Sequence, residues 1–206
     1  MAAVLERIKV VRLGLSPYES TLKAMRDFTA KRSADTPDEI WLLEHPPVYT
    51  FGLAADAAHG PKIESTIPVV HVERGGEVTY HGPGQLVLYT LVDLARRAIK
   101  VKQFVSMLEQ SVIDLLGGRG ERRLGAPGVY VGGAKVAALG IRVSRGCAFH
   151  GLALNVDMDL RPFSAIDPCG HPGMQVTQTR DLGILASKED LGDKLAGILV
   201  GKLEHA

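Results

Sequence analysis

The sequence predicts an α/β (α+β) fold, with a single domain in which helices flank a mixed, largely antiparallel sheet. The chain has 206 residues, of which 46% are hydrophobic, and this is enough apolar material for one core. Short β-branched runs often follow one another with only turn residues between them, whereas helical periodicity occurs in a few separate segments. Such irregular spacing favours a mixed sheet over repeated βαβ units. We therefore expect residues 1–206 to form one domain.

The N-terminal half predicts one helix among several strands. Residues 8–14 form a β-branched run, and Ser16, Pro17 and Glu19 predict a helix start, with serine as N-cap, proline in the first helical position and glutamate closing a capping box. The helix should end near Arg32, and its apolar residues have the spacing of a helix that packs on a sheet. Further strands are expected at residues 39–43, 48–51, 68–72 and 85–92, and exposed loops at 31–38 and 54–62.

The C-terminal half predicts two more helices. Residues 102–116 repeat apolar side chains at helical spacing, and two glycines end this segment. Strands are expected at 128–131, 134–143 and 147–156, and a last helix begins at the N-cap Ser187. The glycine- and arginine-rich run 117–128 is expected to be a solvated loop, because no strand precedes it as a nucleotide-binding turn would require.

Charge and composition argue against several classes of protein. Lysine and arginine number 24 against 23 acidic residues, and a formal charge of +1 does not suggest a protein that coats nucleic acid. No apolar run is long enough for a membrane span, and the first residues lack the pattern of a signal peptide. We therefore expect a cytoplasmic protein, in which two cysteines do not form a structural disulfide.

Residues 74–85, RGGEVTYHGPGQ, predict a ligand-binding segment. Glycines at 75, 76, 82 and 84 remove the Cβ atoms that would keep a ligand away from the main chain. Hydrogen-bonding side chains surround this bare backbone: Arg74, Thr79, Tyr80, His81 and Gln85. A glycine-rich hairpin with incidental polar residues is the alternative. The segment lacks the spacing of a phosphate-binding P-loop.

A thiol and a lysine are the candidate catalytic groups. Cys169 lies in DPCGHPG, a tight loop that can present sulfur at a surface, whereas Cys147 heads an apolar strand and is expected to be packed. A reactive thiolate needs a nearby cation or base. Lys135 lies between glycines and an apolar strand, where partial desolvation would lower its pKa, although a lysine that extends to water is the alternative. No metal is expected, because Cys169 and His171 have no second ligand pair.

Five segments together resemble the lipoyl(octanoyl) transferases. They are EHPPVYTFG from Glu44, RGGEVTYHGPGQLVLY from Arg74, GAKVAALGIRV from Gly133, FHGLALNV from Phe149 and PCG from Pro168. Their order and spacing match this family across residues 44–170. Thr90 and Gln178 depart from the pattern, because many relatives have proline and serine there. The resemblance implies the fold shared by biotin protein ligases and lipoate ligases.

The resemblance also implies an activity and a set of site residues. The activity is transfer of an octanoyl group from acyl carrier protein, where it is carried on phosphopantetheine, to a lysine of lipoyl domains in 2-oxo acid dehydrogenase E2 subunits and the glycine cleavage H protein. Cys169 matches the acyl-accepting nucleophile and Lys135 its partner, with no metal or nucleotide cofactor. The implied substrate contacts are Arg74, Gly75, Gly76, Glu77, Val78, Thr79, Tyr80, His81, Ala138, Leu139, Gly140, Gly151, Leu152 and Ala153, with His150 and Gly170 in support.

Further expectations concern the slot for the acyl chain, the groups that stabilise the oxyanion and the surface on which partner domains dock. An octanoyl chain needs an apolar slot, for which we expect Val78, Leu139 and Leu152 as lining. Backbone N–H groups of Leu139 or Gly170 are candidates to stabilise the oxyanion. Acidic partner domains would dock on surface arginines, for which Arg74, Arg142 and Arg145 are the candidates. We expect a monomer that binds neither nucleic acid nor membrane.

Three other functions remain open from the sequence. An ATP-dependent lipoate or biotin ligase would use the lysine without a cysteine nucleophile. A non-catalytic module that binds acyl carrier protein would retain the pocket but function without Cys169. A cysteine hydrolase would need His81 or His150 as base, yet neither has an evident orienting carboxylate nearby in the sequence.

Overall fold

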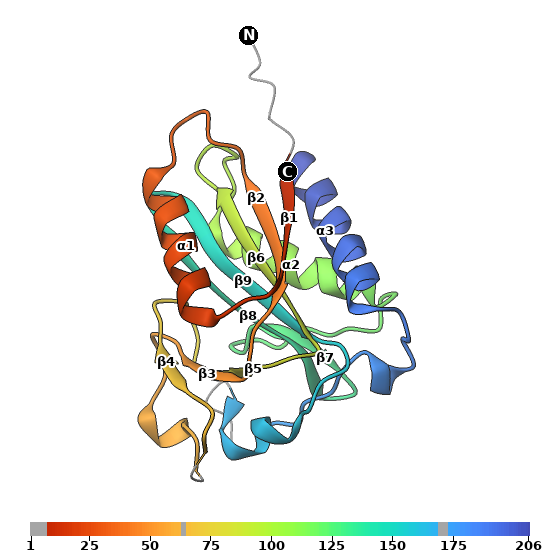
Figure 1. Ribbon diagram of the computed structural model, residues 1–206. Helices are drawn as coiled ribbons and strands as arrows, with labels where there is room; N and C mark the ends of the chain where they lie inside the picture. Colours follow the sequence, from red (N-terminus) through yellow and green to blue (C-terminus); the bar gives the residue numbers. More distant parts are fainter. Residues whose placement is uncertain (1–7, 63–64, 169–172) are drawn as a thin grey trace.

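Two sheets form the framework of the computed structural model, which describes residues 8–62, 65–168 and 173–206 (Figure 1). The larger sheet has the order β1-β2-β6-β9-β8-β7. Its strands are β1 (Lys9–Leu15), β2 (Glu39–Glu44), β6 (Gln85–Asp93), β7 (Gly128–Val131), β8 (Ala134–Ser144) and β9 (Cys147–Asn155). The β1–β2 pair is parallel and the other pairs are antiparallel, which confirms the predicted mixed, largely antiparallel sheet.

The smaller sheet lies at one end of the larger sheet, where β6 begins (Figure 1). Its order is β4-β3-β5, with β3 at Val48–Phe51, β4 at Val69–His71 and β5 at Val78–His81. The strand β5 lies inside the segment 74–85, where the sequence analysis predicted a ligand-binding segment and no strand. Because β5 pairs with β3 and not with a neighbour in the sequence, its strand conformation depends on a contact that local pattern does not reveal.

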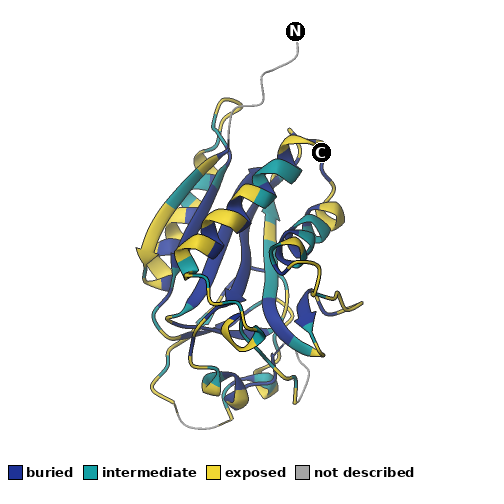
Figure 2. Ribbon diagram, turned by 90° about the vertical axis from the view of Figure 1, so that its right-hand side faces the viewer, coloured by how far each residue is buried: buried dark blue, intermediate teal, exposed yellow. Residues whose placement is uncertain are grey.

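Helices cover both faces of the larger sheet. The helix α1 (Tyr18–Lys31) packs on one face against β6 and β9, whereas α2 (Val101–Leu115) and α3 (Lys188–Glu204) pack together on the other (Figure 1). Short 3-10 helices occupy connecting segments at Ala57–His59, Arg161–Ala165 and Arg180–Leu182. The three-layer arrangement buries the strands on both sides, and exposed residues lie on the outer sides of the helices (Figure 2).

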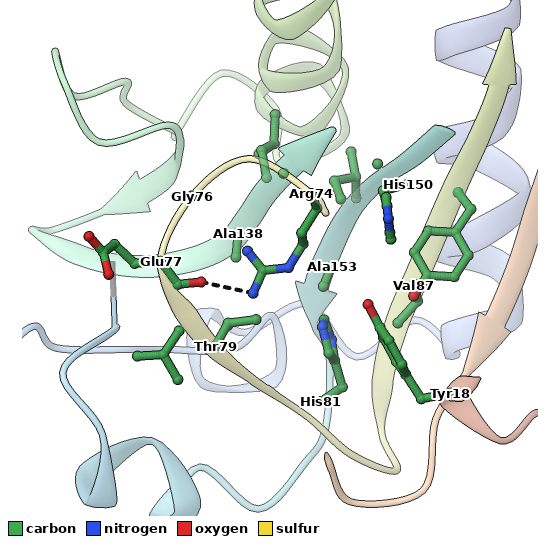
Figure 3. Close-up of a pocket in the computed structure, with 16 residues that line it drawn as sticks. Tyr18, Arg74, Gly76, Glu77, Thr79, His81, Val87, Ala138, His150 and Ala153 are labelled. Atoms are coloured by element: carbon green, nitrogen blue, oxygen red, sulfur yellow. Dashed lines mark hydrogen bonds between the residues drawn. The ribbon is translucent and has the colours of Figure 1, made fainter. Parts of the chain in front are cut away.

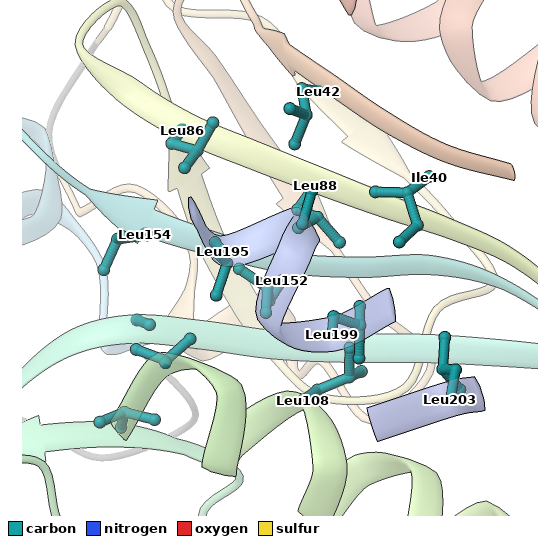
Figure 4. Close-up of a cluster of buried hydrophobic side chains, with 14 of the residues drawn as sticks. Ile40, Leu42, Leu86, Leu88, Leu108, Leu152, Leu154, Leu195, Leu199 and Leu203 are labelled. Carbon is teal, nitrogen blue, oxygen red and sulfur yellow. The ribbon is translucent and has the colours of Figure 1, made fainter. Parts of the chain in front are cut away.

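The main hydrophobic core lies between the larger sheet and the helices α2 and α3 (Figure 4). Strand residues such as Leu88 and Leu152 meet Leu108 of α2 and Leu195 and Leu199 of α3. Each fully buried leucine contributes about 1.5–3 kcal/mol to folding. The predicted N-cap of the last helix is confirmed, because Oγ of Ser187 accepts a hydrogen bond from the backbone N–H of Asp190.

The start of α1 differs from the prediction. Pro17 is the N-cap residue and Ser16 makes no capping bond to the helix. Instead, the backbone N–H of Ser16 donates to the carbonyl of Glu44, which continues the pairing of the parallel strands, and its hydroxyl donates to Leu13. The capping-box prediction is therefore wrong by one residue, because sheet pairing holds Ser16 in extended structure.

The loop after α1 also differs from the prediction at its end. Most of residues 31–38 are exposed or partly exposed, but the carboxylate of Asp38 is fully buried. It accepts hydrogen bonds from Arg97 Nε at 2.6 Å and from Arg96 Nη2 at 2.9 Å, and it pairs with the buried Arg32. The backbone N–H of Asp93 also donates to it at 2.8 Å. A chain of three arginines and one aspartate thus joins the end of α1 to the end of β6.

Candidate active site

A pocket lies between the larger sheet, the segment 74–81 and the first turn of α1 (Figure 3). We call it the central pocket. Its lining residues are Tyr18, Arg74, Gly76, Glu77, Val78, Thr79, His81, Val87, Tyr89, Ala138, Leu139, Gly140, His150, Gly151, Leu152 and Ala153. All three segments that the sequence analysis assigned to substrate contact therefore meet at one place.

Strand pairing explains why these segments converge. In the β8–β9 ladder, Ala138 faces Ala153 and Gly140 faces Gly151. The backbone N–H of Gly75 donates to the carbonyl of Ile141 at 2.9 Å and attaches the segment 74–77 to the free edge of β8. Residues that are about 65 and 75 positions apart in the sequence are thereby brought against one another.

Gly140 is required by this close approach. A Cβ atom at position 140 would lie 2.7 Å from the carbonyl oxygen of Gly75 and 3.2 Å from Cδ of Arg74. Gly82 and Gly84 serve a different purpose from the one expected. Neither lines the central pocket, and Cβ atoms there would lie 2.3 Å from the Tyr80 hydroxyl and 2.0 Å from the Asp157 carbonyl oxygen. These two glycines allow the chain to pack on itself and not on a ligand.

Arg74 holds the segment in place from within. Its Nη2 donates to the carbonyl and hydroxyl of Thr50, both at 2.8 Å, and to the carbonyl of Glu77 at 2.9 Å, as the dashed line in Figure 3 indicates. Only 8% of Arg74 is exposed. The expectation that Arg74 serves in surface docking is therefore wrong, because its guanidinium group is committed to main-chain carbonyls. Arg142 and Arg145 are exposed.

A series of hydrogen bonds beside α1 fixes the direction of the Tyr89 hydroxyl. His45 Nδ1 donates to the carbonyl of Ser16 at 2.6 Å, because a carbonyl can only accept. Burial lowers the pKa of His45 to about 4, so its Nε2 is an acceptor, and Tyr89 donates to it at 2.8 Å. Burial raises the pKa of Tyr18 to about 12 and raises the pKa of Tyr89 as well, so both phenols are protonated.

A second chain sets the tautomer of His81. Asn155 Nδ2 donates to the carbonyl of Thr177 at 2.9 Å, so its Oδ1 accepts from Gln85 Nε2 at 3.0 Å. Gln85 Oε1 must then accept from Nδ1 of His81, at 2.7 Å. Burial lowers the pKa of His81 to about 3, and the ring is neutral with an unprotonated Nε2. The amide of Gln85, and not a carboxylate, therefore orients this ring.

His150 is the most unusual residue of the pocket. Its φ angle is +62°, in the left-handed region that non-glycine residues rarely adopt, and it is 1% exposed. Within the described ranges, neither of its ring nitrogens has a hydrogen-bond partner. Burial lowers its pKa to about 3, so the ring is neutral.

Lys135 lies in β8 and is 3% exposed. Its Nζ donates to the carbonyl of Pro127 at 3.4 Å and lies 5.1 Å from the centre of the Tyr130 ring. The prediction of a desolvated lysine agrees with this burial, and the alternative of a lysine that extends to water does not. Pro127 lines a neighbouring pocket, here called the adjacent pocket, which shares Gly76, Glu77, Leu139 and Gly140 with the central pocket.

Cys169 and Gly170 lie outside the described residues. The chain before them is anchored at Asp167, whose carboxylate pairs with Lys62 at 2.6 Å and His59 at 3.3 Å. The chain after them runs beside Lys135, because the N–H of Lys135 donates to Gln175 at 2.8 Å and its carbonyl accepts from Thr177 at 2.9 Å. His59 also lines the adjacent pocket. The described residues on both sides of Cys169 thus lie beside the adjacent pocket or beside Lys135.

Cys147, the other cysteine, lies at the start of β9 and is buried. Burial raises the pKa of its thiol, and its Sγ contacts the carbonyl of Arg145 at 3.8 Å. A protonated, packed thiol of this kind is typical of a structural cysteine.

Two predicted contact residues do not line the central pocket. Gly75 lines the adjacent pocket, and Tyr80 faces Tyr49 and Phe163 in a separate hydrophobic cluster. The sequence analysis missed Tyr18, Val87 and Tyr89. Their positions had been explained as the apolar face of a helix and a supporting strand, and no local signal separates such residues from a pocket wall.

The described residues contain neither a metal-binding cluster nor a membrane-spanning helix. Across residues 8–62, 65–168 and 173–206, no three histidine, cysteine, aspartate or glutamate side chains are grouped so that they can hold a metal ion. No helix in the same ranges is both long and apolar enough to cross a membrane.

Solved structures with low sequence identity share this fold. A bi-partite lipoate protein ligase from Thermoplasma acidophilum matches with a TM-score of 0.73 at 15% identity, over 96% of this chain and 83% of its own. A biotin protein ligase from Aquifex aeolicus matches with a TM-score of 0.58 at 13% identity, over 95% and 70%. The chain thus has the fold of the catalytic domain of the lipoate and biotin protein ligases.

Sequence comparison is more specific. The family model described as the lipoyl protein ligase A/B catalytic domain matches residues 17–195. An octanoyltransferase from Dechloromonas aromatica is 55% identical over 95% of this chain and 97% of its own length. One from Thiobacillus denitrificans is 60% identical over 87% and 84%. The chain belongs to the octanoyltransferases, within the lipoyl protein ligase A/B family.

Proposed function

We propose that the chain transfers an octanoyl group from the phosphopantetheine arm of acyl carrier protein to a lysine of lipoyl domains, through a thioester on Cys169. Octanoyl transfer follows from family membership. The carriers, the acyl-enzyme and the roles of individual residues are the proposal. The proposed donor, acyl carrier protein, implies that the enzyme acts in the cytoplasm. The enzyme is proposed to act as a monomer, because one chain supplies every residue assigned to the reaction.

The first half-reaction forms the acyl-enzyme. Lys135 accepts the thiol proton of Cys169, and the thiolate attacks the thioester carbonyl. When the tetrahedral intermediate collapses, the bond to the pantetheine sulfur breaks, and the Lys135 ammonium returns the proton to that leaving group. The buried position of Lys135, beside the chain segment that follows Cys169, supports this role.

The second half-reaction releases the product. The amine of the target lysine attacks the octanoyl thioester, neutral Lys135 accepts the amine proton, and the thiolate of Cys169 leaves and is reprotonated. No nucleotide is consumed, because the thioester is already activated. The N–H of Leu139 is a candidate for the oxyanion site, since alternate strand residues point to the same edge and Ile141 binds Gly75 there.

One observation carries the proposal. The segments 74–81, 138–140 and 150–153 meet in a pocket with apolar walls, and Lys135 contacts the pocket that adjoins it. Val78, Leu139 and Leu152 all line the central pocket, in agreement with the expected acyl slot. An acyl chain in the central pocket would thus have its carbonyl end near the buried lysine.

Intact-protein mass spectrometry tests the acyl-enzyme. The enzyme is mixed with octanoyl-acyl carrier protein and no acceptor. We expect one octanoyl adduct on the wild type and on the matched control Cys147→Ser, none on Cys169→Ser, and loss of the adduct when a lipoyl domain is added. Transfer by Cys169→Ser at the wild-type rate, or an adduct that requires Cys147, would contradict the proposal.

Two further measurements separate the remaining candidates. Lys135→Met should lower the rate of adduct formation by roughly 10²- to 10⁴-fold, the usual contribution of a general acid–base residue. Free octanoate with ATP and magnesium should give no transfer, because that reaction is the signature of a ligase. Activity that depends on ATP would favour the ligase function instead.

A further inference from the structure

The end of the central pocket beside α1 is polar, although its walls are apolar. The rings of His150, Tyr18 and His81 lie at this end in Figure 3, and Glu77 lies at the other. Ring centres are 5.9 Å apart for Tyr89 and His150 and also for Tyr18 and His81. The residues shared with the adjacent pocket, Gly76, Glu77, Leu139 and Gly140, do not include this group. The polar cluster is therefore remote from the lysine end.

Both the backbone conformation of His150 and the burial of its ring are energetically unfavourable. It adopts a left-handed backbone conformation, and within the part of the chain that the structure describes its buried ring nitrogens have no hydrogen-bond partner. Buried polar groups are almost always hydrogen-bonded, and strained residues persist mainly at functional sites. The Thr90 hydroxyl supports the conformation by donating to the His150 carbonyl at 3.0 Å. Together these features indicate that the His150 ring binds a polar group that the described residues do not supply.

The neighbouring groups specify the chemistry of that partner. A neutral imidazole offers one N–H donor and one acceptor nitrogen. The hydroxyl of Tyr18, which lines the same pocket, can donate or accept a hydrogen bond. A group that complements both residues must form hydrogen bonds with the imidazole and with the phenol hydroxyl. A hydroxyl group does both, and a methyl group does neither.

The distance along the sheet matches an acyl chain. In the β8–β9 ladder, Ala138 pairs with Ala153 and Ile141 pairs with His150. Three residues of strand span about 10 Å. This is close to the length of an extended medium-length acyl chain, so the terminal carbon of a chain with its carbonyl near Ala138 comes close to His150.

We propose that His150 and Tyr18 form a binding site for one hydroxyl group at the end of the acyl pocket beside α1, and that this site selects acyl chains by their terminal atom. The inference rests on the proposed placement of the acyl chain. A chain that reaches His150 is accepted better when it ends in a hydroxyl than when it ends in a methyl. A shorter chain shows the reverse order, because its hydroxyl is buried among the apolar walls without a partner. Medium-chain ω-hydroxyacyl thioesters are thus a further substrate class.

Matched pairs of acyl donors test this proposal. Each pair has the same number of heavy atoms and differs only in a terminal methyl or hydroxyl, from heptanoyl and 6-hydroxyhexanoyl up to decanoyl and 9-hydroxynonanoyl, all presented on acyl carrier protein. The measured quantity is the ratio of kcat/KM for methyl and hydroxyl chains. We expect the methyl chain to be favoured roughly 10- to 100-fold in the shortest pair, and this preference to fall by about 10-fold or more at the length that reaches His150.

Variants show whether His150 causes the change. In His150→Leu the methyl preference should stay the same at every length, whereas His150→Asn, which tolerates a left-handed backbone and can hydrogen-bond, should retain part of the fall. Tyr18→Phe should make the fall in methyl preference smaller. A methyl preference that does not vary with length in the wild type, or a fall that persists in His150→Leu, would overturn the inference. Failure of the wild type to transfer octanoyl would instead contradict the proposed function.

Discussion

The hydroxyl of Thr90 donates a hydrogen bond to the carbonyl oxygen of His150 at 3.0 Å, from β6 to β9. Thr90 is fully buried, and His150 has a φ angle of +62°. The pairing of β6 with β9 is recorded on both sides of this point, from Gln85 to Tyr89 and again at Val92 and Asp93. The threonine side chain therefore satisfies a carbonyl that the regular ladder does not.

Replacement of this threonine should weaken the fold. In Thr90→Val the shape is similar, but the His150 carbonyl is left buried without its partner. We expect the free energy of unfolding to fall by about 1–3 kcal/mol, which is the cost of an unsatisfied buried polar group. Urea denaturation measures this change, and Thr66→Val, at an exposed threonine, is the matched control. Equal stability of the two variants would show that the hydrogen bond contributes nothing.

Three buried histidines should make the protein sensitive to mild acid. Burial lowers the pKa of His45 to about 4 and those of His81 and His150 to about 3. In the unfolded chain each titrates near 6.5, so the unfolded state binds these protons first and stability is lost as the pH falls below about 6.5. We expect a loss of roughly 4–6 kcal/mol between pH 7 and pH 5.

Urea unfolding curves at several pH values measure this loss. In His150→Asn the loss of unfolding free energy between pH 7 and pH 5 should be about a third smaller, because one of the three buried histidines is removed. A change below about 1 kcal/mol between pH 7 and pH 5 in the wild type would mean that these rings are protonated or accessible in the folded state.

The buried Asp38 should be essential for stability. Its burial alone would raise its pKa, but the N–H of Asp93 and the guanidinium of Arg97 more than compensate and hold the pKa below its usual value. Its stabilising effect is therefore present above the unfolded pKa of about 3.9 and is lost as the pH falls through the lower folded pKa. Asp38→Asn should cost about 3–5 kcal/mol, because arginines that are mostly buried lose their counter-charge.

Thermal unfolding at pH 7 measures the effect of Asp38→Asn, and exposed Asp35→Asn is the control. The difference between Asp38→Asn and the wild type should shrink below about pH 4, because the unfolded wild-type chain takes up a proton at this carboxyl there, whereas the folded carboxyl does so only at a lower pH. A difference that is constant down to pH 2 would point to packing instead of charge.

A methyl group at Gly140 should disturb the acyl pocket. In Gly140→Ala the new Cβ would lie 2.7 Å from the Gly75 carbonyl oxygen, so the segment 74–77 must move away from β8. We expect octanoyl transfer to fall by about 10-fold or more, with a loss of stability of about 1–3 kcal/mol. Gly197→Ala is the control, because its Cβ would meet no atom within 4 Å and should leave transfer unchanged. Normal transfer by Gly140→Ala would show that the segment tolerates the displacement.

Much of the fold could be predicted from the sequence, because its signals are local. The limits of β3, the periodicity of the helices and the cap at Ser187 each depend on a few neighbouring residues. For the opposite reason, the strand β5 was not predicted and the start of α1 was predicted one residue too early. The first depends on pairing with β3 and the second on the bond between Ser16 and Glu44, and both partners are distant in the sequence.

The sequence by itself determined the fold class, the family and the segments that form the site, because glycines, polar side chains and apolar strands at set spacings carry that information locally. Only the tertiary structure decided which groups meet. It turned Arg74 inward onto Thr50, made Tyr18 and Tyr89 part of the pocket and left His150 strained. The physical reason is that hydrogen-bond partners and burial depend on strand pairing between segments far apart in the chain, and no local pattern specifies them.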